Sequence, residues 1–295
     1  MEYKKSIFCR EVISLFFSRG FIFAVSVIRY ILLQKTEGAQ MITNYHTHTQ
    51  RCYHAKGKDE EFVIAAIERG LNVLGFADHG PWPYENYVSG MRMPLSEAED
   101  YIRSINALKK KYADKIEIKL GFEYEYFPEY TDWLREFIRE NGIDYIILGH
   151  HFVPREIGGA YAGRLMPVNV LYDYCDQVCE GIKTGLFAYV AHPDLYMREY
   201  PSFDEHARAV ANKICDTAKE CDIPLEYNIL GLRKAENEGR EGYPYHSFWK
   251  IAAEKSNRVI LGIDAHTPQE ITDSKYISIA EKAVAELGLE VCRYI

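Results

Sequence analysis

Short apolar runs rich in β-branched and aromatic residues alternate along the chain with longer amphipathic stretches. This alternation is typical of an α/β protein whose strands lie parallel. Seven runs predict strands: Ile42–Tyr45, Leu71–Ala77, Ile116–Phe122, Tyr145–Gly149, Phe187–Ala191, Ile223–Tyr227 and Val259–Ile263. We therefore expect a parallel sheet with helices in the connections between its strands.

Apolar residues recur at helical spacing in several of these connections. The clearest patterns span Glu60–Arg69, Ser96–Tyr112, Tyr130–Glu140 and a stretch that runs from Ser202 to about Lys219. Ser96 with Glu99, and Ser202 with Glu205, have the spacing of capping boxes, so we expect helices to begin there. The glycine-rich segment 154–166 predicts a surface loop.

The first forty residues differ from the rest of the chain. Their apolar stretch is interrupted by Arg19 and Arg29, and its longest uncharged run is too short to cross a bilayer core of ~30 Å. Met41 directly precedes the first predicted strand. We expect residues 41–295 to form the functional domain and residues 1–40 to be an apolar leader, which is an upstream start, a packed helix or a weak anchor.

The composition narrows the choice of partners and location. The net charge of the 295 residues is -8, and acidic and basic residues are mixed without a basic stripe, so we do not expect nucleic-acid binding. The number of cysteines, seven, is odd, which argues against a disulfide framework and favours a reducing compartment. We expect a cytoplasmic protein that does not enter the membrane. Homo-oligomerisation stays open.

Almost every predicted strand is followed at once by a residue of a type that binds metal ions. In chain order these residues are His46 and His48, Asp78 and His79, Glu123, His150 and His151, His192, Glu226 and Asn228, and Asp264 and His266. The reactive groups of parallel barrels lie at the carboxyl ends of the strands, so these side chains should converge. A single histidine after a strand is more often an ordinary hydrogen-bonded residue, but the repetition at successive strand ends favours a metal site.

The spacing of the first pair supports this interpretation. Residues i and i+2 of an extended strand point to the same side, so His46 and His48 can bind one ion together. Asp264 and His266 repeat that spacing, and His54 lies in a loop that could fold back over the site. Nitrogen and oxygen donors suit Zn²⁺, Mn²⁺ or Fe²⁺, and clustered ions suit the hydrolysis of phosphate esters.

Several side chains keep more than one interpretation. Of His150 and His151, one is expected to be a ligand. Glu226 and Asn228 either orient a ligand or fill the barrel. Asp78 could orient a ligand histidine or move a proton. The candidates for binding phosphate are arginines, which can pair with two phosphate oxygens: Arg92 in the loop after the second strand, then Arg164, Arg198 and Arg233.

Six segments carry a family resemblance. They are HTHTQ at His46–Gln50, GFADHG at Gly75–Gly80, GFEYEY at Gly121–Tyr126, ILGHHF at Ile147–Phe152, AHPD at Ala191–Asp194 and GIDAH at Gly262–His266. Together, and in this order, they resemble the PHP (polymerase and histidinol phosphatase) family. Ser89–Ile102 (SGMRMPLSEAEDYI) and Leu225–Arg233 (LEYNILGLR) are similar to its histidinol-phosphatase branch.

The resemblance implies a distorted seven-stranded parallel (β/α) barrel with three divalent metal ions. The implied ligand sets are His46, His48, Glu123 and Asp264 for the first ion, Glu123, His151 and His192 for the second, and His54, His79 and His266 for the third. It favours His151 over His150, because His151 directly precedes the phenylalanine of the motif. Glu123 and Asp264 are then expected to take part in catalysis, with Asp78 in support.

The leading hypothesis is hydrolysis of L-histidinol phosphate to L-histidinol and phosphate in histidine biosynthesis. The alternatives are a PHP phosphoesterase for another small phosphate ester, a nucleotide or phosphotyrosine, and a non-catalytic metal-binding PHP module. The loops 81–94 and 154–166 are expected to determine the choice of substrate.

Overall fold

The part of the chain that the structure describes comprises residues 41–295 of a computed structural model. The predictions for residues 1–40 lie outside the described residues, and the division of the chain at Met41 stays a prediction. Within residues 41–295, no helix combines the length and the apolar character that crossing a membrane requires.

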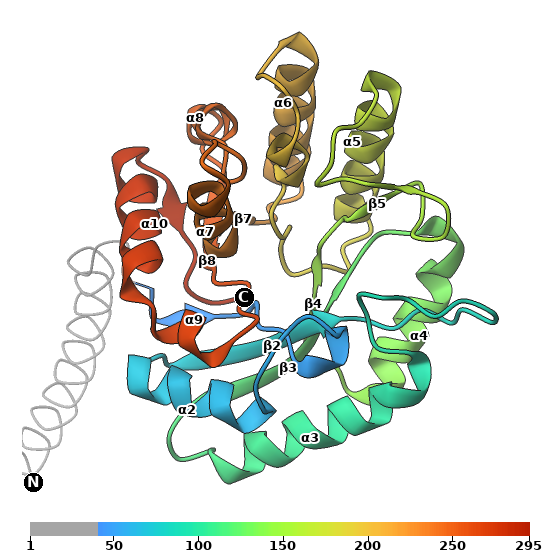
Figure 1. Cartoon of the computed structure of the whole chain (residues 1–295), viewed down its shortest axis with the longest axis vertical. Coiled ribbons are helices and arrows are strands. Elements are labelled where there is room, and N and C mark those ends of the chain that lie inside the picture. Colours follow the sequence, from blue (N-terminus) through green and yellow to red (C-terminus); the bar gives the residue numbers. More distant parts are fainter. Residues whose placement is uncertain (1–40) are drawn as a thin grey trace, which may run out of the picture. The chain divides into compact units, whose positions relative to one another are not determined.

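Parallel strands form the centre of this unit (Figure 1). Four of them pair in the order β1-β2-β3-β4 and make a curled sheet: β1 (Thr43–Asn44), β2 (Val73–His79), β3 (Glu117–Tyr124) and β4 (Tyr145–Leu148). A second parallel group has the order β7-β8-β9: β7 (Leu225–Asn228), β8 (Arg258–Gly262) and β9 (Glu290–Val291). Isolated bridges join Leu148 to Val190, Val190 to Leu225, and Thr47 to Ala265. The predicted α/β class with parallel strands is confirmed.

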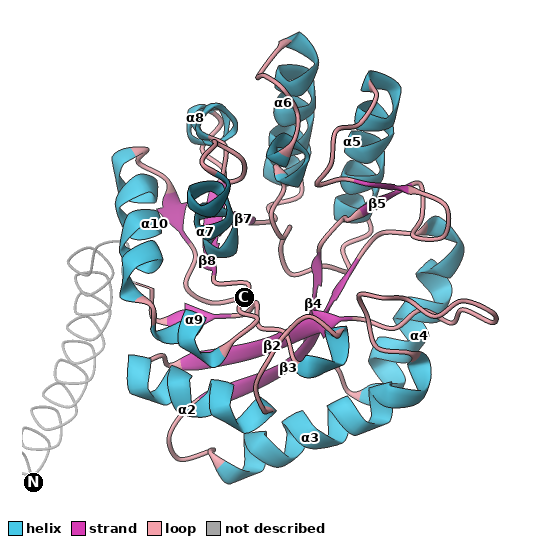
Figure 2. Cartoon of the chain, in the orientation of Figure 1, coloured by secondary structure: helices cyan, strands magenta, loops and turns pink. Residues whose placement is uncertain are grey.

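Helices lie around the outside of these strands (Figure 2). Their bounds are α2 (Asp59–Arg69), α3 (Ala98–Lys111), α4 (Thr131–Asn141), α5 (Val168–Lys183), α6 (Glu205–Glu220), α7 (Ile229–Glu238), α8 (His246–Glu254), α9 (Pro268–Thr272) and α10 (Ser274–Glu286). Short 3₁₀ turns occur at η1 (Gln50–Cys52), η2 (Leu95–Glu97), η3 (Pro128–Tyr130) and η4 (Leu195–Arg198).

Two helix starts were predicted wrongly. Ser96 lies inside η2, and α3 begins after Glu97, which makes no side-chain cap. The N-cap of α6 is Asp204 rather than Ser202. The Asp204 carboxylate accepts hydrogen bonds from two free N–H groups of the first turn, at 3.0 and 2.9 Å, which makes it the stronger cap.

The strand predictions failed at three places. The segment Phe187–Ala191 forms only the isolated bridges at Val190. The predicted loop 154–166 contributes β6 (Ala160–Tyr161), which pairs antiparallel with β5 (Phe152–Val153). The C-terminal strand β9 was not predicted. These pairings are only one or two residues long, too short for a periodic pattern to reveal.

Side chains that point inward from the strands form a continuous core. The members of this core are Tyr45, Val73, Ala77, Tyr145, Ile147, Tyr189, Ala191 and Ile260. Tyr145 lies across the interior and donates its hydroxyl proton to the carbonyls of Tyr45 (2.6 Å) and Phe76 (3.1 Å). Its ring passes over Gly121, where a Cβ atom would lie 2.5 Å from the ring carbons. The absence of a side chain at Gly121 therefore makes room for Tyr145.

We predict that Gly121→Ala destabilises the protein by about 1–3 kcal/mol, because the added methyl group overpacks a ring that its hydroxyl bonds hold in place. The measurement is the free energy of unfolding in urea. Gly90→Ala is the matched control, because a Cβ atom at Gly90 meets no heavy atom within 4 Å. Equal stabilities of the two variants would contradict the proposed packing.

Candidate metal centre

The period of two along each strand brings the candidate ligands to one end of the interior. On β3, Gly121 faces the core, so Glu123 two residues later faces the same way. On β4 the inward Ile147 is followed, four residues later, by His151. The inward Ile260 of β8 precedes Asp264 in the same manner. The donors thus continue the inward rows of the core beyond its apolar part.

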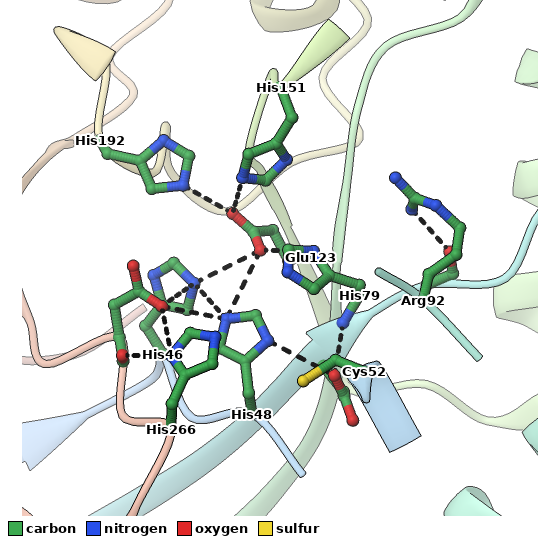
Figure 3. A network of polar contacts seen from close by, with 12 residues as sticks. His46, His48, Cys52, His79, Arg92, Glu123, His151, His192 and His266 are labelled. Carbon is green, nitrogen blue, oxygen red and sulfur yellow. Dashed lines mark hydrogen bonds and ion pairs between the residues drawn. The ribbon is translucent and has the colours of Figure 1, made fainter. Parts of the chain in front are cut away.

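The first group of donors surrounds one oxygen of Glu123. The Nε2 atoms of His46 and His48 each lie 3.6 Å from Glu123 Oε2. They lie 3.5 and 3.1 Å from Asp264 Oδ1, and 3.1 Å from each other. The structure therefore brings together the four residues of the first implied ligand set (Figure 3).

The second group of donors surrounds the other oxygen of the same carboxylate. His192 Nε2 lies 2.8 Å and His151 Nε2 3.5 Å from Glu123 Oε1. Figure 3 shows both rings on one side of Glu123, opposite His46 and His48. His192 reaches this position from a backbone with a φ of 29°, a left-handed conformation that is uncommon for a residue with a side chain.

The third group consists of stacked imidazoles. The ring of His266 lies 4.2 Å from that of His48 and 4.8 Å from that of His54, measured between centroids. The rings of His54 and His79 are 5.4 Å apart. Donor atoms of His48, His79 and His266 all lie within 4.8 Å of one another. The three residues of the third implied set are therefore neighbours, and His48 lies among them.

Five of the imidazoles donate a hydrogen bond through Nδ1, and this bond fixes the direction in which Nε2 points. The Nδ1 atoms of His46, His48, His54, His151 and His266 donate, respectively, to Glu226 (2.7 Å), Asp78 (3.4 Å), Cys52 O (2.6 Å), Glu125 (3.1 Å) and Asp264 O (2.9 Å). In the neutral form of each imidazole, Nε2 is then left as an acceptor. The Nε2 atoms of His46 and His48 face each other at 3.1 Å, a contact that a bound cation would make favourable. This donor set fits divalent metal ions.

The charges of the centre point the same way. Burial acts to lower the pKa of His46, but the carboxylates of Glu226 and Asp264 raise it to about 10. Burial would raise the pKa of Glu123, yet the charges of His151 and His46 hold it well below its usual range. Both shifts show that positive charge in the interior stabilises the buried carboxylates, and metal ions would supply such charge.

Glu226, Asn228 and Asp78, whose roles the sequence left open, hold the candidate ligands in place. Glu226 accepts from His46 Nδ1 and, through its other oxygen, from the backbone N–H of His192 at 3.0 Å. Asn228 donates to Glu226 at 2.8 Å and to Asp264 at 3.2 Å. Asp78 bonds His48 and the backbone N–H groups of Thr49 and His79, at 3.1 and 2.8 Å. It is fully buried and does not line the pocket described below.

The adjacent histidines His150 and His151 have different surroundings. His151 faces the metal centre, whereas His150 lies between the rings of Phe127 and Tyr174. Neither ring nitrogen of His150 has a hydrogen-bond partner within the described residues, and burial lowers its pKa to about 4. His150 is therefore a buried neutral side chain packed against aromatic rings, and His151 stays the predicted ligand of the pair.

The structure places the four arginines that were predicted to bind phosphate away from the pocket at the metal centre, whose lining within residues 41–295 contains none of them. Arg92 is buried, and its three nitrogens bond Glu156 (2.7 Å), Glu125 (2.6 Å) and the Gly80 carbonyl (2.9 Å). Figure 3 shows it apart from the imidazoles. Through Glu125 it is connected to His151. Its role as a phosphate clamp stays a prediction.

The other three arginines lie further out. Arg164 is exposed on the segment after β6. Arg198 pairs with Glu238 at 2.6 Å, and Arg233 pairs with Asp273 at 3.0 Å. Their phosphate-binding roles also stay predictions.

A pocket of about 280 Å³ opens onto the metal centre and reveals residues that sequence reasoning missed. The wall that is not made of candidate ligands contains Met91, Tyr161, Leu195, Leu230, Lys234 and Tyr243. Lys234 donates to the Tyr243 hydroxyl at 3.3 Å and, within residues 41–295, has no carboxylate within 4.0 Å. The sequence held a signal for two of these residues, because Leu230 and Lys234 are four residues apart on α7 and so share a helix face. Their neighbour Arg233 was chosen instead.

Comparison with known proteins identifies the family. The family model of the PHP domain matches residues 44–229, which is more than half of the chain. The chain belongs to the PHP family. The matched span contains the candidate ligands from His46 to His192, and Asp264 and His266 follow it.

Named relatives of this PHP chain belong to the histidinol-phosphatase branch. A probable histidinol-phosphatase of Deinococcus radiodurans is 28% identical over 77% of this chain and 86% of its own length. The histidinol-phosphatase of Bacillus subtilis is 24% identical over 81% of this chain and 96% of its own length. A histidinol phosphate phosphatase of Lactococcus lactis, solved with zinc, L-histidinol and phosphate, has the same fold, with a TM-score of 0.67, 20% identity and coverage of 84% and 94%.

We predict that His192→Ala lowers both the bound metal per chain and the phosphatase turnover, the latter by at least ~100-fold, because even residues that only support a ligand cost 10–100-fold when removed. The measurement is elemental analysis of the purified protein beside a turnover assay. His246→Ala, at an exposed position of α8, is the control. Unchanged metal content and activity in His192→Ala would remove His192 from the second ligand set.

Proposed function

We propose that this chain is a metal-dependent phosphomonoesterase that hydrolyses L-histidinol phosphate to L-histidinol and phosphate. The observation that carries this proposal is the convergence of acceptor nitrogens and carboxylates at the base of a pocket of about 280 Å³. Membership of the PHP family and relatives named histidinol-phosphatase support the substrate. The proposal includes a place for this step in histidine biosynthesis and a cytoplasmic location.

Three divalent ions, Zn²⁺, Mn²⁺ or Fe²⁺, form part of the proposal. Glu123 would contribute Oε1 to the ion of His151 and His192, and Oε2 to the ion of His46 and His48. Such ions supply Lewis-acid activation of the phosphoryl group and of a water nucleophile. We also propose that the strands close into a distorted seven-stranded barrel, and the bridges at Val190 and Thr47 support this closure.

The carboxylates of the centre take different roles in this proposal. Glu123 and Asp264 would hold the ions that activate the phosphoryl group and the water. Asp78 is a positioning residue, because its oxygens hold His48 Nδ1 and the backbone around Thr49 away from the pocket. Glu226 positions His46 in the same way.

Lys234 is the cation that we propose for the phosphate. Lys234 lines the same pocket as Glu123, Asp264 and the candidate histidine ligands, so we place the phosphate between this lysine and the metal ions. Burial lowers the pKa of Lys234, and the charge of Asp264 opposes this effect. The aromatic and aliphatic residues of the same wall would enclose the organic part of a small substrate.

The function is tested by phosphate release from L-histidinol phosphate with protein loaded in turn with Mn²⁺, Zn²⁺ or Fe²⁺. We expect kcat/KM for this ester to exceed that for other phosphomonoesters, nucleotides and phosphotyrosine in the same panel. A preference for another ester would retain the metal centre and reject the substrate. No turnover with any metal ion would favour a non-catalytic PHP module.

We predict that Lys234→Ala lowers kcat/KM for the phosphate ester by roughly 10- to 150-fold, since a hydrogen bond to a charged group contributes about 1.5–3 kcal/mol. Inorganic phosphate should inhibit this variant more weakly. Lys234→Arg should recover part of the activity, and Lys250→Ala, exposed on α8, should have no effect. Wild-type kinetics of Lys234→Ala would exclude the contact with phosphate.

A further inference from the structure

A thiol lies among the imidazoles of the third group. Cys52, the last residue of η1, is fully buried. Its Sγ lies within 4.8 Å of donor nitrogens of His54 and His266, which themselves lie within 4.8 Å of each other. Figure 3 shows this sulfur on the side of His48 and His266. No role at this centre has been assigned to Cys52 by the motifs above.

The backbone around Cys52 is anchored on both sides. The Thr49 hydroxyl is bonded to Asp78, and Tyr53 closes η1 with a left-handed φ of 67° and a 3.0 Å bond from its N–H to Gln50 O. Further along, the N–H of Lys56 donates to the carbonyl of His266 at 2.8 Å. A backbone hydrogen bond therefore joins the loop that carries Cys52 and His54 to His266 itself.

We propose that Cys52 Sγ is a ligand of the metal ion bound by His54 and His266, so that the third position of the centre is a mixed nitrogen and sulfur site. This proposal rests on the metal binding of the proposed function. It adds a sulfur donor to the implied set of His54, His79 and His266. On coordination the thiol releases its proton to solvent, and the thiolate binds the ion.

The distances suit such a site. A tetrahedral ion ~2.3 Å from a sulfur and ~2.1 Å from a nitrogen holds these two donors ~3.6 Å apart. The donor atoms of Cys52, His54 and His266 lie within 4.8 Å of one another, so they would close around an ion by moving inward. The Nδ1 of His54 is engaged by Cys52 O, which leaves its Nε2 for the ion. A thiolate would make this position select softer ions such as Zn²⁺ over Mn²⁺ or Mg²⁺.

A second observation points to a cation beside this cluster. His79 is 4% exposed and lines the pocket beside His54 and His266. Its Nδ1 lies 3.0 Å from Glu123 Oε2, yet neither atom has a hydrogen-bond partner among the described residues. Buried polar atoms are nearly always satisfied, so these two atoms indicate a missing partner such as a cation.

The test is spectroscopy of the full chain loaded with Co²⁺ alone. We expect the wild type to show a near-ultraviolet thiolate-to-cobalt charge-transfer band. Cys52→Ser and Cys52→Ala should lose the band and the metal content of a single site, while the ions of the first two groups remain bound. Cys221→Ser, at an exposed cysteine after α6, should keep the full band.

X-ray absorption of the zinc-loaded wild type provides a measurement that needs no variant, and we expect a sulfur neighbour at ~2.3 Å from zinc. Cobalt-loaded wild type without the band, a full band in Cys52→Ser, or a zinc spectrum without sulfur would each overturn the proposal. The spectra are recorded without a phosphate ester. A protein that shows the band but hydrolyses no ester would therefore reject the proposed function and leave the thiolate ligand standing.

Discussion

The buried carboxylate of Glu123 is the interaction on which the candidate centre depends. One of its oxygens faces His151 and His192, and the other faces His46 and His48. An ionised carboxylate with 1% of its surface exposed is costly unless positive charge surrounds it. The imidazoles and the ions that they can bind provide that charge, which links the two donor groups into one unit.

A layer of polar residues behind the ligands determines their direction. Glu226, Asp78 and Glu125 each bond an imidazole through Nδ1, so that Nε2 of that imidazole faces Glu123. Arg92 balances the charge of Glu125 and of Glu156 within the same buried network. The strength of this layer comes from its burial, because hydrogen bonds between charged groups are little screened there.

The pocket has two chemically different walls. Histidines and carboxylates form the first wall, and strand ends and the loop after η1 carry them. The second wall comes from α7, the hairpin of β5 and β6 and the loop before α8, and it contributes Lys234, Tyr161 and Tyr243. The first wall determines the type of reaction in our proposal. The second wall determines which phosphate ester fits, because it contains the groups that would touch the organic part.

The α/β class, the parallel strands and the candidate ligands that converge could be predicted from the sequence, because strand periodicity and the position of a residue just after a strand are local properties. The surroundings of each cation and thiol depend on contacts between segments that are distant in the chain. Arg92 and Lys234 are both cations in plausible places, yet partners more than thirty positions away in the chain engage Arg92, while Lys234 remains in the pocket wall. The same holds for Cys52, whose nearness to His266 depends on a loop folding over the end of another strand. Contacts between distant segments depend on packing and burial, which no local pattern contains.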